Sequence, residues 1–194
     1  MSAAQPHVLV PVANGSEEIE TVTIIDTLVR GGIKVTCASV HSTSLQVVCS
    51  RGVKLVADRF LKDCTSDTFD MIVCPGGMPG SEHLRDSAEL TTLLKMQKER
   101  GAWLGAICAA PAVVFKTHGI LDVTTPATGY PAEKFKTAIG ASYDEDKATV
   151  VSGRVVTSQG PGTAMAFSLK LVELLVSKDK AAAVAKEMLT PVPP

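Results

Sequence analysis

The sequence predicts an α/β fold in which a mostly parallel central sheet carries helices on both faces. Short apolar runs rich in β-branched residues alternate with longer segments of helical period along the chain, which is typical of consecutive βαβ units. The length of 194 residues suits one core and is too short for two ordinary domains joined by a linker. We therefore expect a single domain over residues 1–194.

The expected strands share apolar, β-branched composition and end at Gly-, Asn- or Ser-containing turns. They cover residues 7–13, 33–40, 45–49, 53–57, 69–74, 103–107, 148–151 and 155–158. The pair at 45–49 and 53–57 flanks Ser50-Arg51-Gly52 and predicts a hairpin, as does the pair around Gly153. The rest should pair mainly in parallel, because long helical segments separate them.

The expected helices begin at polar or proline-containing turns and end near glycine or basic residues. They run from the acidic segment at 17–20 to Gly31-Gly32, from Ser81 to about Arg100, over 109–118, from Gly160-Pro161-Gly162-Thr163 to about Val176, and over 178–189. Residues 191–194 read as a frayed tail.

The composition excludes several classes of protein. Nineteen basic residues against twenty acidic ones give a net charge of −1, so no overall field draws the chain to nucleic acid or to an anionic membrane. The most apolar stretch without a charge around the candidate helix, residues 101–115, contains Pro111 and is shorter than the roughly 20 residues that span a bilayer. The first residues lack the pattern of a secretory signal, so we expect a cytoplasmic protein.

The five cysteines predict free thiols. Their number is odd and no two lie close in sequence, which argues against a disulfide framework, a zinc site or a dithiol redox motif. We therefore expect no metal. Neither a Gly-Lys-Ser/Thr ending nor a Gly-x-Gly-x-x-Gly fingerprint is present in the glycine-rich turns, so we also expect no nucleotide and no other cofactor.

Cys108 is the best candidate for a nucleophile. Ligands of an open parallel sheet gather beyond the carboxyl ends of its strands, and the turns at 14–20, 75–80 and 107–110 fall there. A cysteine where a strand meets a helix lies near the positive end of the helix dipole, which favours the thiolate. The competing interpretation is that Cys108 is a small buried apolar residue, as most cysteines are.

No base for this cysteine is evident among the histidines. His118 lies ten residues further along the next helix, about 15 Å away at a rise of ~1.5 Å per residue, and is expected to cap a helix end. The other three are expected at the surface. Glu17, Glu18 and Glu20 follow a neighbouring strand; a glutamate turned inward there would have a raised pKa and could share a proton with a thiolate. Periodicity does not tell which of the three turns inward.

Five short motifs occur in order along the chain. They are Gly15-Ser16-Glu17-Glu18-Ile19-Glu20-Thr21, Ser50-Arg51, Pro75-Gly76-Gly77-x-x-Gly80, Ala106-Ile107-Cys108-Ala109 and Gly160-Pro161-Gly162-Thr163. Together they resemble the ThiJ/PfpI superfamily of class I glutamine amidotransferase-like proteins, and in particular its parkinsonism-associated protein deglycase branch. Each motif alone is weak, but together they cover nearly the whole chain. The resemblance implies a flavodoxin-like sandwich.

The resemblance also implies roles for individual residues. Cys108 would be the reactive cysteine, Glu20 the protonated acid bonded to its sulfur, and the amides of Gly77 and Ala109 the oxyanion site. Arg30 and Arg51 match family arginines near the site at a dimer interface, so a homodimer is implied. The expected lining of the substrate pocket is Gly76, Tyr130, Arg51, Arg30 and Pro161.

The sequence departs from the family pattern at three places. Tyr130 stands where many relatives have a histidine, and its phenol is a poor general base near neutrality. Ala109 follows the cysteine where the protease branch has a histidine, which disfavours peptide hydrolysis. Val56 occupies the place of a cysteine that relatives carry near the dimer contact.

The function that this resemblance implies is a cofactor-independent glyoxalase or protein deglycase. It would act on methylglyoxal, glyoxal or their early adducts on amines and thiols, and would protect against carbonyl and oxidative stress. The alternative is a redox-sensing chaperone in which Cys108 is oxidised to the sulfinate with little turnover.

Overall fold

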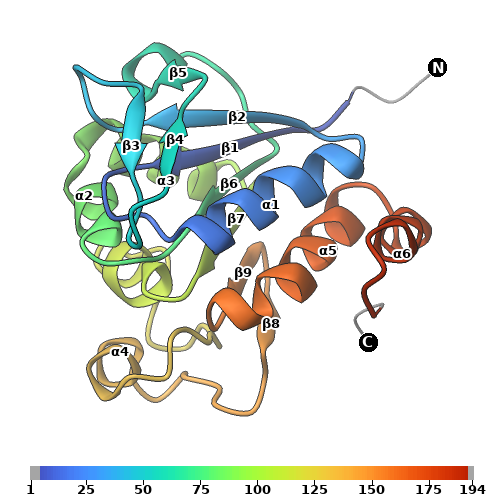
Figure 1. Ribbon diagram of the computed structural model, residues 1–194. Coiled ribbons are helices and arrows are strands. Elements are labelled where there is room, and N and C mark those ends of the chain that lie inside the picture. Colours follow the sequence, from blue (N-terminus) through green and yellow to red (C-terminus); the bar gives the residue numbers. More distant parts are fainter. Residues whose placement is uncertain (1–4, 192–194) are drawn as a thin grey trace.

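The computed structural model describes residues 5–191, and its centre is one seven-stranded sheet (Figure 1). The strands are β1 (His7–Val12), β2 (Lys34–Ser39), β5 (Arg59–Phe60), β6 (Met71–Cys74), β7 (Trp103–Ile107), β8 (Thr149–Ser152) and β9 (Val155–Ser158). Their order across the sheet is β5-β2-β1-β6-β7-β9-β8. Neighbouring strands are parallel except for β8 and β9, which form the predicted hairpin. The prediction of a mostly parallel sheet is confirmed.

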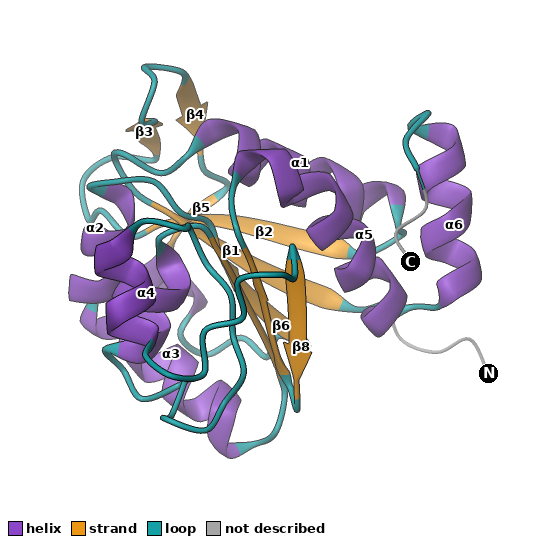
Figure 2. Cartoon of the chain, turned by 90° about the horizontal axis from the view of Figure 1, so that it is seen from below, coloured by secondary structure: helices purple, strands orange, loops and turns teal. Residues whose placement is uncertain are grey.

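Helices cover both faces of this sheet, which confirms the flavodoxin-like sandwich. They are α1 (Glu18–Arg30), α2 (Gly80–Asp86), α3 (Ala88–Glu99), α4 (Glu133–Ile139), α5 (Ala164–Leu175) and α6 (Lys178–Glu187). Figure 2 shows the sheet between a layer with α1 and α5 and a layer with α2 and α3. Helix α6 packs outside α5, against Leu169, through Val184 and Ala185. None of the described helices is long and apolar enough to cross a bilayer.

The central strands are the ones that the apolar runs predicted most directly. All four residues of β6 are buried, as are five of the six residues of β1. A parallel strand covered by helices on both faces has no side for polar residues, so it is a continuous apolar run and not an alternating one. The edge strand β8 is less buried and keeps polar side chains.

The hairpin of β3 (Gln46–Val48) and β4 (Lys54–Val56) forms a separate two-stranded sheet, as predicted. It is tied to the turn after β1 because the N–H of Gly15 donates to the carbonyl of Val48 at 2.8 Å. In return, the N–H of Val48 donates to Asn14 Oδ1 at 2.8 Å. The hairpin therefore holds its own turn, Ser50-Arg51, over the start of α1.

The structure corrects several expected boundaries. The single helix expected from Ser81 to Arg100 is two, because Ser87 is extended and its Oγ accepts a hydrogen bond from Leu90 N to start α3. The helix expected over 109–118 is a π-helical segment, Pro111–Lys116. The strand β5, the 3-10 turn Leu61–Cys64 and helix α4 were not predicted; each is seven residues or fewer, too short for a clear period. Of the expected tail, 192–194 lie outside the described residues.

Candidate active site

Three turns converge at the carboxyl ends of neighbouring strands, as the sequence predicted. The strand order reverses beside β1, with β2 on one side and β6 on the other, and β7 follows β6. Such a reversal is where open α/β sheets bind ligands, because the adjacent turns separate there. The turns also bond to each other, since the N–H of Glu17 donates to the carbonyl of Gly76 at 3.0 Å.

Cys108 occupies the turn after β7 in a strained conformation. Its φ of 63° is in the left-handed region, which costs a residue with a Cβ about 1–2 kcal/mol. Hydrogen bonds on both sides hold it there: its N–H donates to Ser158 O at 3.0 Å, and its carbonyl accepts from Tyr130 N at 2.8 Å. The backbone N–H groups of Gly77 and Ala109 both donate toward the sulfur. Strain of this kind concentrates at functional sites, which supports the choice of Cys108.

Glu20 is the glutamate beside the sulfur. It lies in the first turn of α1, is 0% exposed, and accepts a hydrogen bond from Gly76 N on Oε2 at 2.7 Å. Its other oxygen, Oε1, is buried and lacks a partner with full hydrogen-bond geometry in the described part of the chain. The Cys108 thiol is the side chain that interacts with this carboxyl.

The other two glutamates of the cluster are also buried, so all three are turned away from solvent. Glu18 accepts hydrogen bonds from Ser50 Oγ and Arg51 N, both at 2.8 Å. Burial opposes its charge, but these bonds, with its own and Val53's backbone N–H, hold its pKa below the usual value. Glu17 caps α1, its Oε2 accepting from Glu20 N at 2.7 Å. Glu18 therefore holds the hairpin turn, Glu17 holds the start of α1, and Glu20 lies against the sulfur of Cys108.

The pKa values of the pair differ from the simple expectation for an elbow cysteine. Burial raises the pKa of Glu20 to about 7. Burial, followed by the charge of Glu20, raises the pKa of the Cys108 thiol to about 12, although the amides of Gly77 and Ala109 act in the opposite direction. The expectation that the position alone favours the thiolate is therefore wrong, because the thiol is only 8% exposed.

Whether Cys108 is a thiolate depends instead on which member of the Glu20–Cys108 pair holds the remaining proton. When Glu20 is protonated, its charge no longer opposes the sulfur, and its O–H can donate to the thiolate. The negative charge then lies on sulfur, which has two N–H donors, and not on the carboxyl, which has one. A Cys108 thiolate is therefore opposed least when Glu20 is protonated.

Two glycines let the turns approach this closely. A Cβ at Gly76 would lie 2.5 Å from Cys108 Cβ and 2.9 Å from Glu20 Oε2. Gly77 has a φ of +87°, and a Cβ there would lie 2.4 Å from Gly15 O. Glycine at both positions follows from these contacts.

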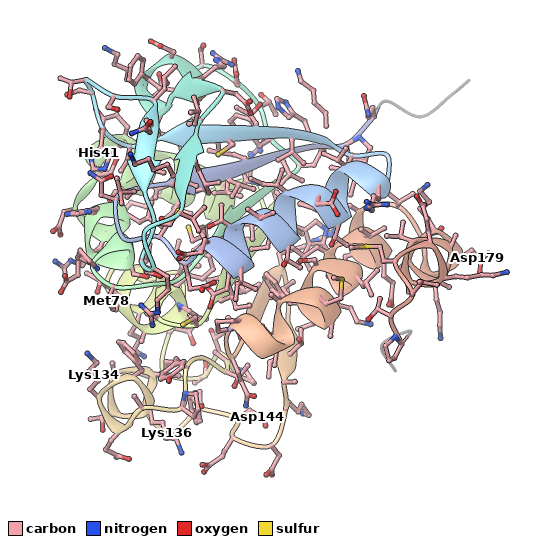
Figure 3. All side chains as sticks on the ribbon, viewed as in Figure 1. His41, Met78, Lys134, Lys136, Asp144 and Asp179 are labelled. Atoms are coloured by element: carbon pink, nitrogen blue, oxygen red, sulfur yellow. The ribbon has the colours of Figure 1, made fainter. Side chains whose placement is uncertain are left out.

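The sulfur opens onto a cleft of about 360 Å³. The expected residues Arg51, Tyr130 and Pro161 line it with Cys108, Gly77 and Ala109, whereas Gly76 lies behind the sulfur. The sequence reasoning did not place Glu17, Ser50, Met78 and Phe135 in this lining. Phe135 lies on the unpredicted helix α4, and its ring meets that of Tyr130 edge to face at 6.4 Å. Met78 is partly exposed and labelled in Figure 3.

The structure does not bring Arg30 to the cleft. It lies in the last turn of α1, ten residues and about 15 Å of helix beyond Glu20. Its guanidinium pairs with Asp26 at 2.8 Å and with Glu187 on α6 at 3.1 Å. The prediction that Arg30 lines the pocket is therefore wrong for this chain. Arg30 instead links α1 to α6.

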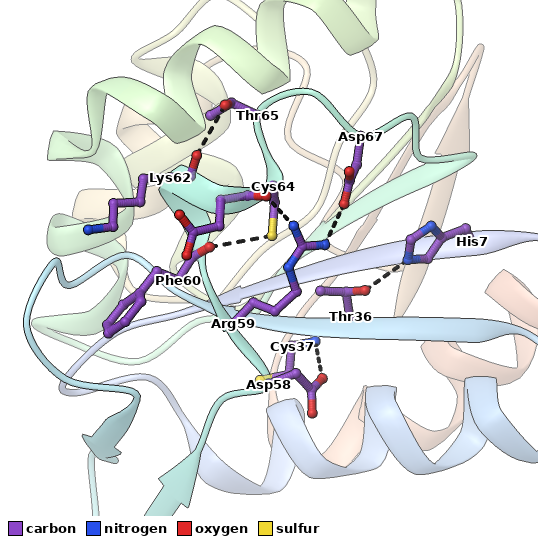
Figure 4. A network of polar contacts seen from close by, with 11 residues as sticks. His7, Thr36, Cys37, Asp58, Arg59, Phe60, Lys62, Cys64, Thr65 and Asp67 are labelled. Carbon is purple, nitrogen blue, oxygen red and sulfur yellow. Dashed lines mark hydrogen bonds and ion pairs between the residues drawn. The ribbon is translucent and has the colours of Figure 1, made fainter.

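The other four cysteines are free, as predicted, and are buried in the protein. Figure 4 shows two of them: the N–H of Cys37 donates to Asp58 at 2.8 Å, and the thiol of Cys64 donates to Phe60 O at 3.5 Å. Burial raises the pKa of Cys49 to about 11 and that of Cys74 still further. Cys108 is the cysteine that lines the cleft.

The histidines lie elsewhere, and no described His lines the cleft. His118 hydrogen-bonds Arg85 O at the end of α2, so it caps a neighbouring helix. His41 and His83 bond the N–H and the carbonyl of Asn14, each at 2.9 Å. Across residues 5–191 there is also no group of three His, Cys, Asp or Glu side chains arranged to hold a metal ion.

These features define a class: α/β proteins with a strained cysteine after a central strand, a buried carboxyl against its sulfur, and two backbone amides directed at it. The chain belongs to the DJ-1/PfpI family, whose sequence profile matches residues 6–174. The family resemblance read from the sequence motifs is confirmed.

Individual relatives agree with this assignment. The chain is 44% identical over 185 residues to "Protein DJ-1 homolog B" of Arabidopsis thaliana, covering 95% of this chain and 42% of that protein. It is 39% identical over 188 residues to "Glutathione-independent glyoxalase DJR-1.2" of Caenorhabditis elegans, covering 97% and 98% of the two chains. The chain spans about half the length of the two Arabidopsis relatives, 42% and 48%.

Solved structures show the same architecture. The structure titled "Toxoplasma gondii DJ-1, oxidized" has a TM-score of 0.91 and 46% sequence identity, covering 95% of this chain and 98% of that one. The arrangement of strands and helices described above is therefore that of the DJ-1 proteins.

Proposed function

We propose that the protein is a cofactor-independent glyoxalase that acts on methylglyoxal, glyoxal or their early adducts on amines and thiols. The observation that carries this proposal is the pairing of Cys108 with the buried Glu20 at the base of an open cleft. The Caenorhabditis elegans relative is named a glutathione-independent glyoxalase, which supports the same reaction class.

In the first step, the Cys108 thiolate attacks the aldehyde carbon and a C–S bond forms. The carbonyl π electrons move to oxygen, which the N–H groups of Gly77 and Ala109 stabilise as charge develops. Glu20 then gives its proton to this oxygen, so that a neutral hemithioacetal and a Glu20 carboxylate result.

In the second step, the Glu20 carboxylate takes the proton from the former aldehyde carbon, the C–H electrons form a C=C bond, and the proton passes to the ketone oxygen, so that a neutral enediol and a Glu20 carboxylate result. The hydroxyl on the first carbon then gives up its proton to become the thioester carbonyl while the second carbon takes a proton, so that the first carbon is oxidised and the second is reduced. No external oxidant is needed, because the two electrons stay within the substrate. Water then cleaves the C–S bond, which releases lactate from methylglyoxal or glycolate from glyoxal and restores the thiol.

The test follows methylglyoxal loss and lactate formation by the wild type, Cys108→Ala and Glu20→Gln. Both variants should lose at least about 100-fold in kcat/KM, the scale of removing a nucleophile or its proton carrier. Cys64→Ala is the matched control, since its buried thiol lies away from the cleft, and it should keep wild-type kinetics. Equal rates in wild type and Cys108→Ala, or no lactate from either, would refute the proposal.

A second candidate function, redox sensing, is favoured by the position of Cys108 in the cleft. Cys108 alone among them lines the cleft, and the amides of Gly77 and Ala109 would hold the oxygens of a sulfinate. Two equivalents of peroxide would oxidise the thiolate first to the sulfenic and then to the sulfinic acid. After graded peroxide, mass spectrometry should find dioxygenation of Cys108 before that of Cys49, Cys64 or Cys74. Indiscriminate oxidation would count against sensing.

We also propose a homodimer through α1 and the β3–β4 hairpin. Val29 on α1 is 55% exposed and Val56 on β4 is 70% exposed, and both line an apolar groove of about 360 Å³ with Val22 and Leu55. A second copy would cover these side chains, which a monomer leaves in water. Light scattering should give about twice the 20.3 kDa chain mass, and Val56→Glu should shift it toward the monomer. A monomeric wild type would reject this interface.

A further inference from the structure

The cleft beside Cys108 has an apolar wall that the reaction above does not use. We define the apolar wall as Met78, Tyr130, Phe135 and Pro161. These residues come from the turn after β6, the segment before α4, α4 itself and the turn after β9. Apolar and aromatic side chains gathered in a concave site are the usual lining of a pocket that binds a small molecule.

Tyr130 is the member of the apolar wall whose backbone is bonded to the reactive turn. Its N–H donates to the carbonyl of Cys108 at 2.8 Å, and its own carbonyl accepts from Ala132 N at 2.8 Å. The carbonyl of Gly129, one residue earlier, accepts from Tyr143 Oη at 3.0 Å. The backbone that carries the phenol ring is therefore fixed relative to the residue that carries the sulfur.

The ring of Tyr130 is also held by its neighbours. It meets the Phe135 ring edge to face, with centroids 6.4 Å apart and an interplanar angle of 84°. It also lies close to Gly160, where a Cβ would be 3.5 Å from Tyr130 Cδ2. Tyr130 is nevertheless 45% exposed, so part of it remains open to a ligand. A ring that is already held loses little further freedom when a second ring packs against it.

The cleft is larger than methylglyoxal requires. Its volume of about 360 Å³ is in the range of pockets that enclose drug-sized ligands, whereas methylglyoxal carries only a methyl group on its ketone carbon. The polar side chains of the lining, Glu17, Ser50 and Arg51, come from the start of α1 and from the hairpin turn. The apolar wall therefore offers contact area that a methyl group leaves unused.

We propose that the apolar wall is a subsite for an aromatic substituent, that Tyr130 determines its specificity, and that aryl oxoaldehydes such as phenylglyoxal are preferred substrates. The aryl group would pack on the exposed part of the Tyr130 ring, offset-stacked or edge to face, while the aldehyde carbon reacts with Cys108. The inference deepens the proposed function and rests on it for the reaction, but the subsite itself can be tested without any oxoaldehyde.

The test compares two neutral alkylating agents, iodoacetamide and N-phenyliodoacetamide. With either reagent a bond forms between the Cys108 sulfur and the reagent carbon and iodide leaves, so the comparison isolates the phenyl group. Mass spectrometry of the Cys108 peptide gives both rates at one fixed pH, and each is divided by the rate for N-acetylcysteine to correct for intrinsic reactivity. Because both reagents need the same thiolate, the ratio of the corrected rates does not depend on the pKa of Cys108.

In the wild type, the corrected rate should be at least about tenfold higher for the phenyl reagent, the scale on which an apolar pocket discriminates. Tyr130→Ala should lower this preference about threefold to tenfold, and Tyr130→Phe should retain it within about twofold because the ring remains. Phe60→Leu is the matched control, since this ring lies on β5 and does not line the cleft; it should keep the preference.

Equal corrected rates in the wild type, or an unchanged preference in Tyr130→Ala, would overturn the proposal. If Tyr130 merely covers the sulfur, Tyr130→Ala raises both rates by the same factor, which is the second of these outcomes. If Tyr130→Ala melts early, Tyr130→Leu provides the decision: it keeps an apolar side chain but has no ring, so the preference should fall, and a wild-type preference would refute the role of the ring.

Initial rates with phenylglyoxal and methylglyoxal separate this inference from the proposed function. The ratio of the two kcat/KM values should favour phenylglyoxal in the wild type and should fall in Tyr130→Ala about as much as the alkylation preference. If the wild type converts neither aldehyde but Tyr130→Ala loses the alkylation preference, the glyoxalase reaction is refuted and the aromatic subsite stands. A kcat/KM ratio that Tyr130→Ala leaves unchanged would overturn the assignment of aryl oxoaldehydes as preferred substrates.

Discussion

The carboxyl edge of the sheet and the α5–α6 contact differ in how well their local conformational preferences agree with the fold. At the carboxyl edge, Cys108 is strained, Glu20 is buried with one oxygen that lacks a partner of full hydrogen-bond geometry among residues 5–191, and Gly76 leaves no room for a Cβ. At the α5–α6 contact, Leu169 packs against Val184 in regular helices, and Ser177 caps α6 with a hydrogen bond to Lys180 N. Each local choice at the second region favours the fold, whereas several at the first oppose it.

This difference makes the carboxyl edge the candidate functional region on physical grounds. Strain and buried titratable groups persist only where the surrounding structure holds them in place. Here the surrounding structure is the central strands β1, β6 and β7, whose apolar residues are buried. The stability of the sheet core therefore supports a local arrangement that would not form by itself.

The largest effect should come from Gly76→Ala. The added Cβ meets Cys108 Cβ and Glu20 Oε2 at 2.5 and 2.9 Å, so the pair must separate. Cys108 alkylation at pH 7 should fall at least about 100-fold, and the free energy of unfolding should fall by about 1–3 kcal/mol in urea titrations. Gly162→Ala is the control, since a Cβ there meets nothing within 4 Å. Retained Cys108 reactivity in Gly76→Ala would show that the close approach is not required.

Leu169→Ala tests the other region. Leu169 is buried between α5 and α6, so its truncation should cost about 2–4 kcal/mol of unfolding free energy. Below the melting transition, Cys108 alkylation should stay at the wild-type rate, because the contact lies outside the site. A proportionate loss of alkylation in the folded protein would mean that the two regions are coupled, and the contrast between them would fail.

The strain at Cys108 can be measured by comparing two variants that both remove the sulfur. Cys108→Gly relieves the left-handed conformation at φ 63°, whereas Cys108→Ala retains it. Part of the gain is offset because glycine has more freedom in the unfolded chain, so Cys108→Gly should be the more stable by about 1 kcal/mol. Thermal and urea unfolding of both variants provide the measurement. An alanine variant at least as stable would contradict the strain.

The smallest effect should be a pH dependence at the turn after β1. His41 accepts the Asn14 N–H on Nε2, and burial, followed by the charge of His83, lowers its pKa. The unfolded chain therefore binds a proton first as the pH falls below about 6.5, and stability is lost there. The loss should be less than about 1 kcal/mol, since the ring is partly exposed and screened. The free energy of unfolding of His41→Gln should depend less on pH over the same range. An unchanged pH dependence would exclude His41 as the cause.

Much of the fold was predictable because its signals are local. Continuous apolar runs marked β1, β6 and β7, and the turns after them marked the edge where ligands bind. The break between α2 and α3 was also present in the sequence, since Ser87 followed by Glu89 is a helix-start pattern that the long apolar period concealed. Helix α4 left too short a pattern, and its Phe135 was therefore missed in the cleft.

The site was predictable in identity but not in electrostatics. Cys108 and Glu20 were selected from position and family motifs, but the burial of Glu17 and Glu18 was not, because acidic residues at a helix start are usually exposed. Arg30 shows the opposite limit: the family resemblance implied a place near the site, but the helix carries the side chain away from the cleft to Glu187.

The sequence by itself determined the order of strands and helices, the turns that face the ligand edge, and the identity of the cysteine, because these depend on residues close together in the chain. Tertiary structure alone decided that Glu17 and Glu18 are buried beside Glu20 and that burial raises the pKa values of both Glu20 and Cys108. The physical reason is that desolvation and charge interaction depend on distances between β1, β6 and β7, which are far apart in sequence and adjacent only in the folded sheet.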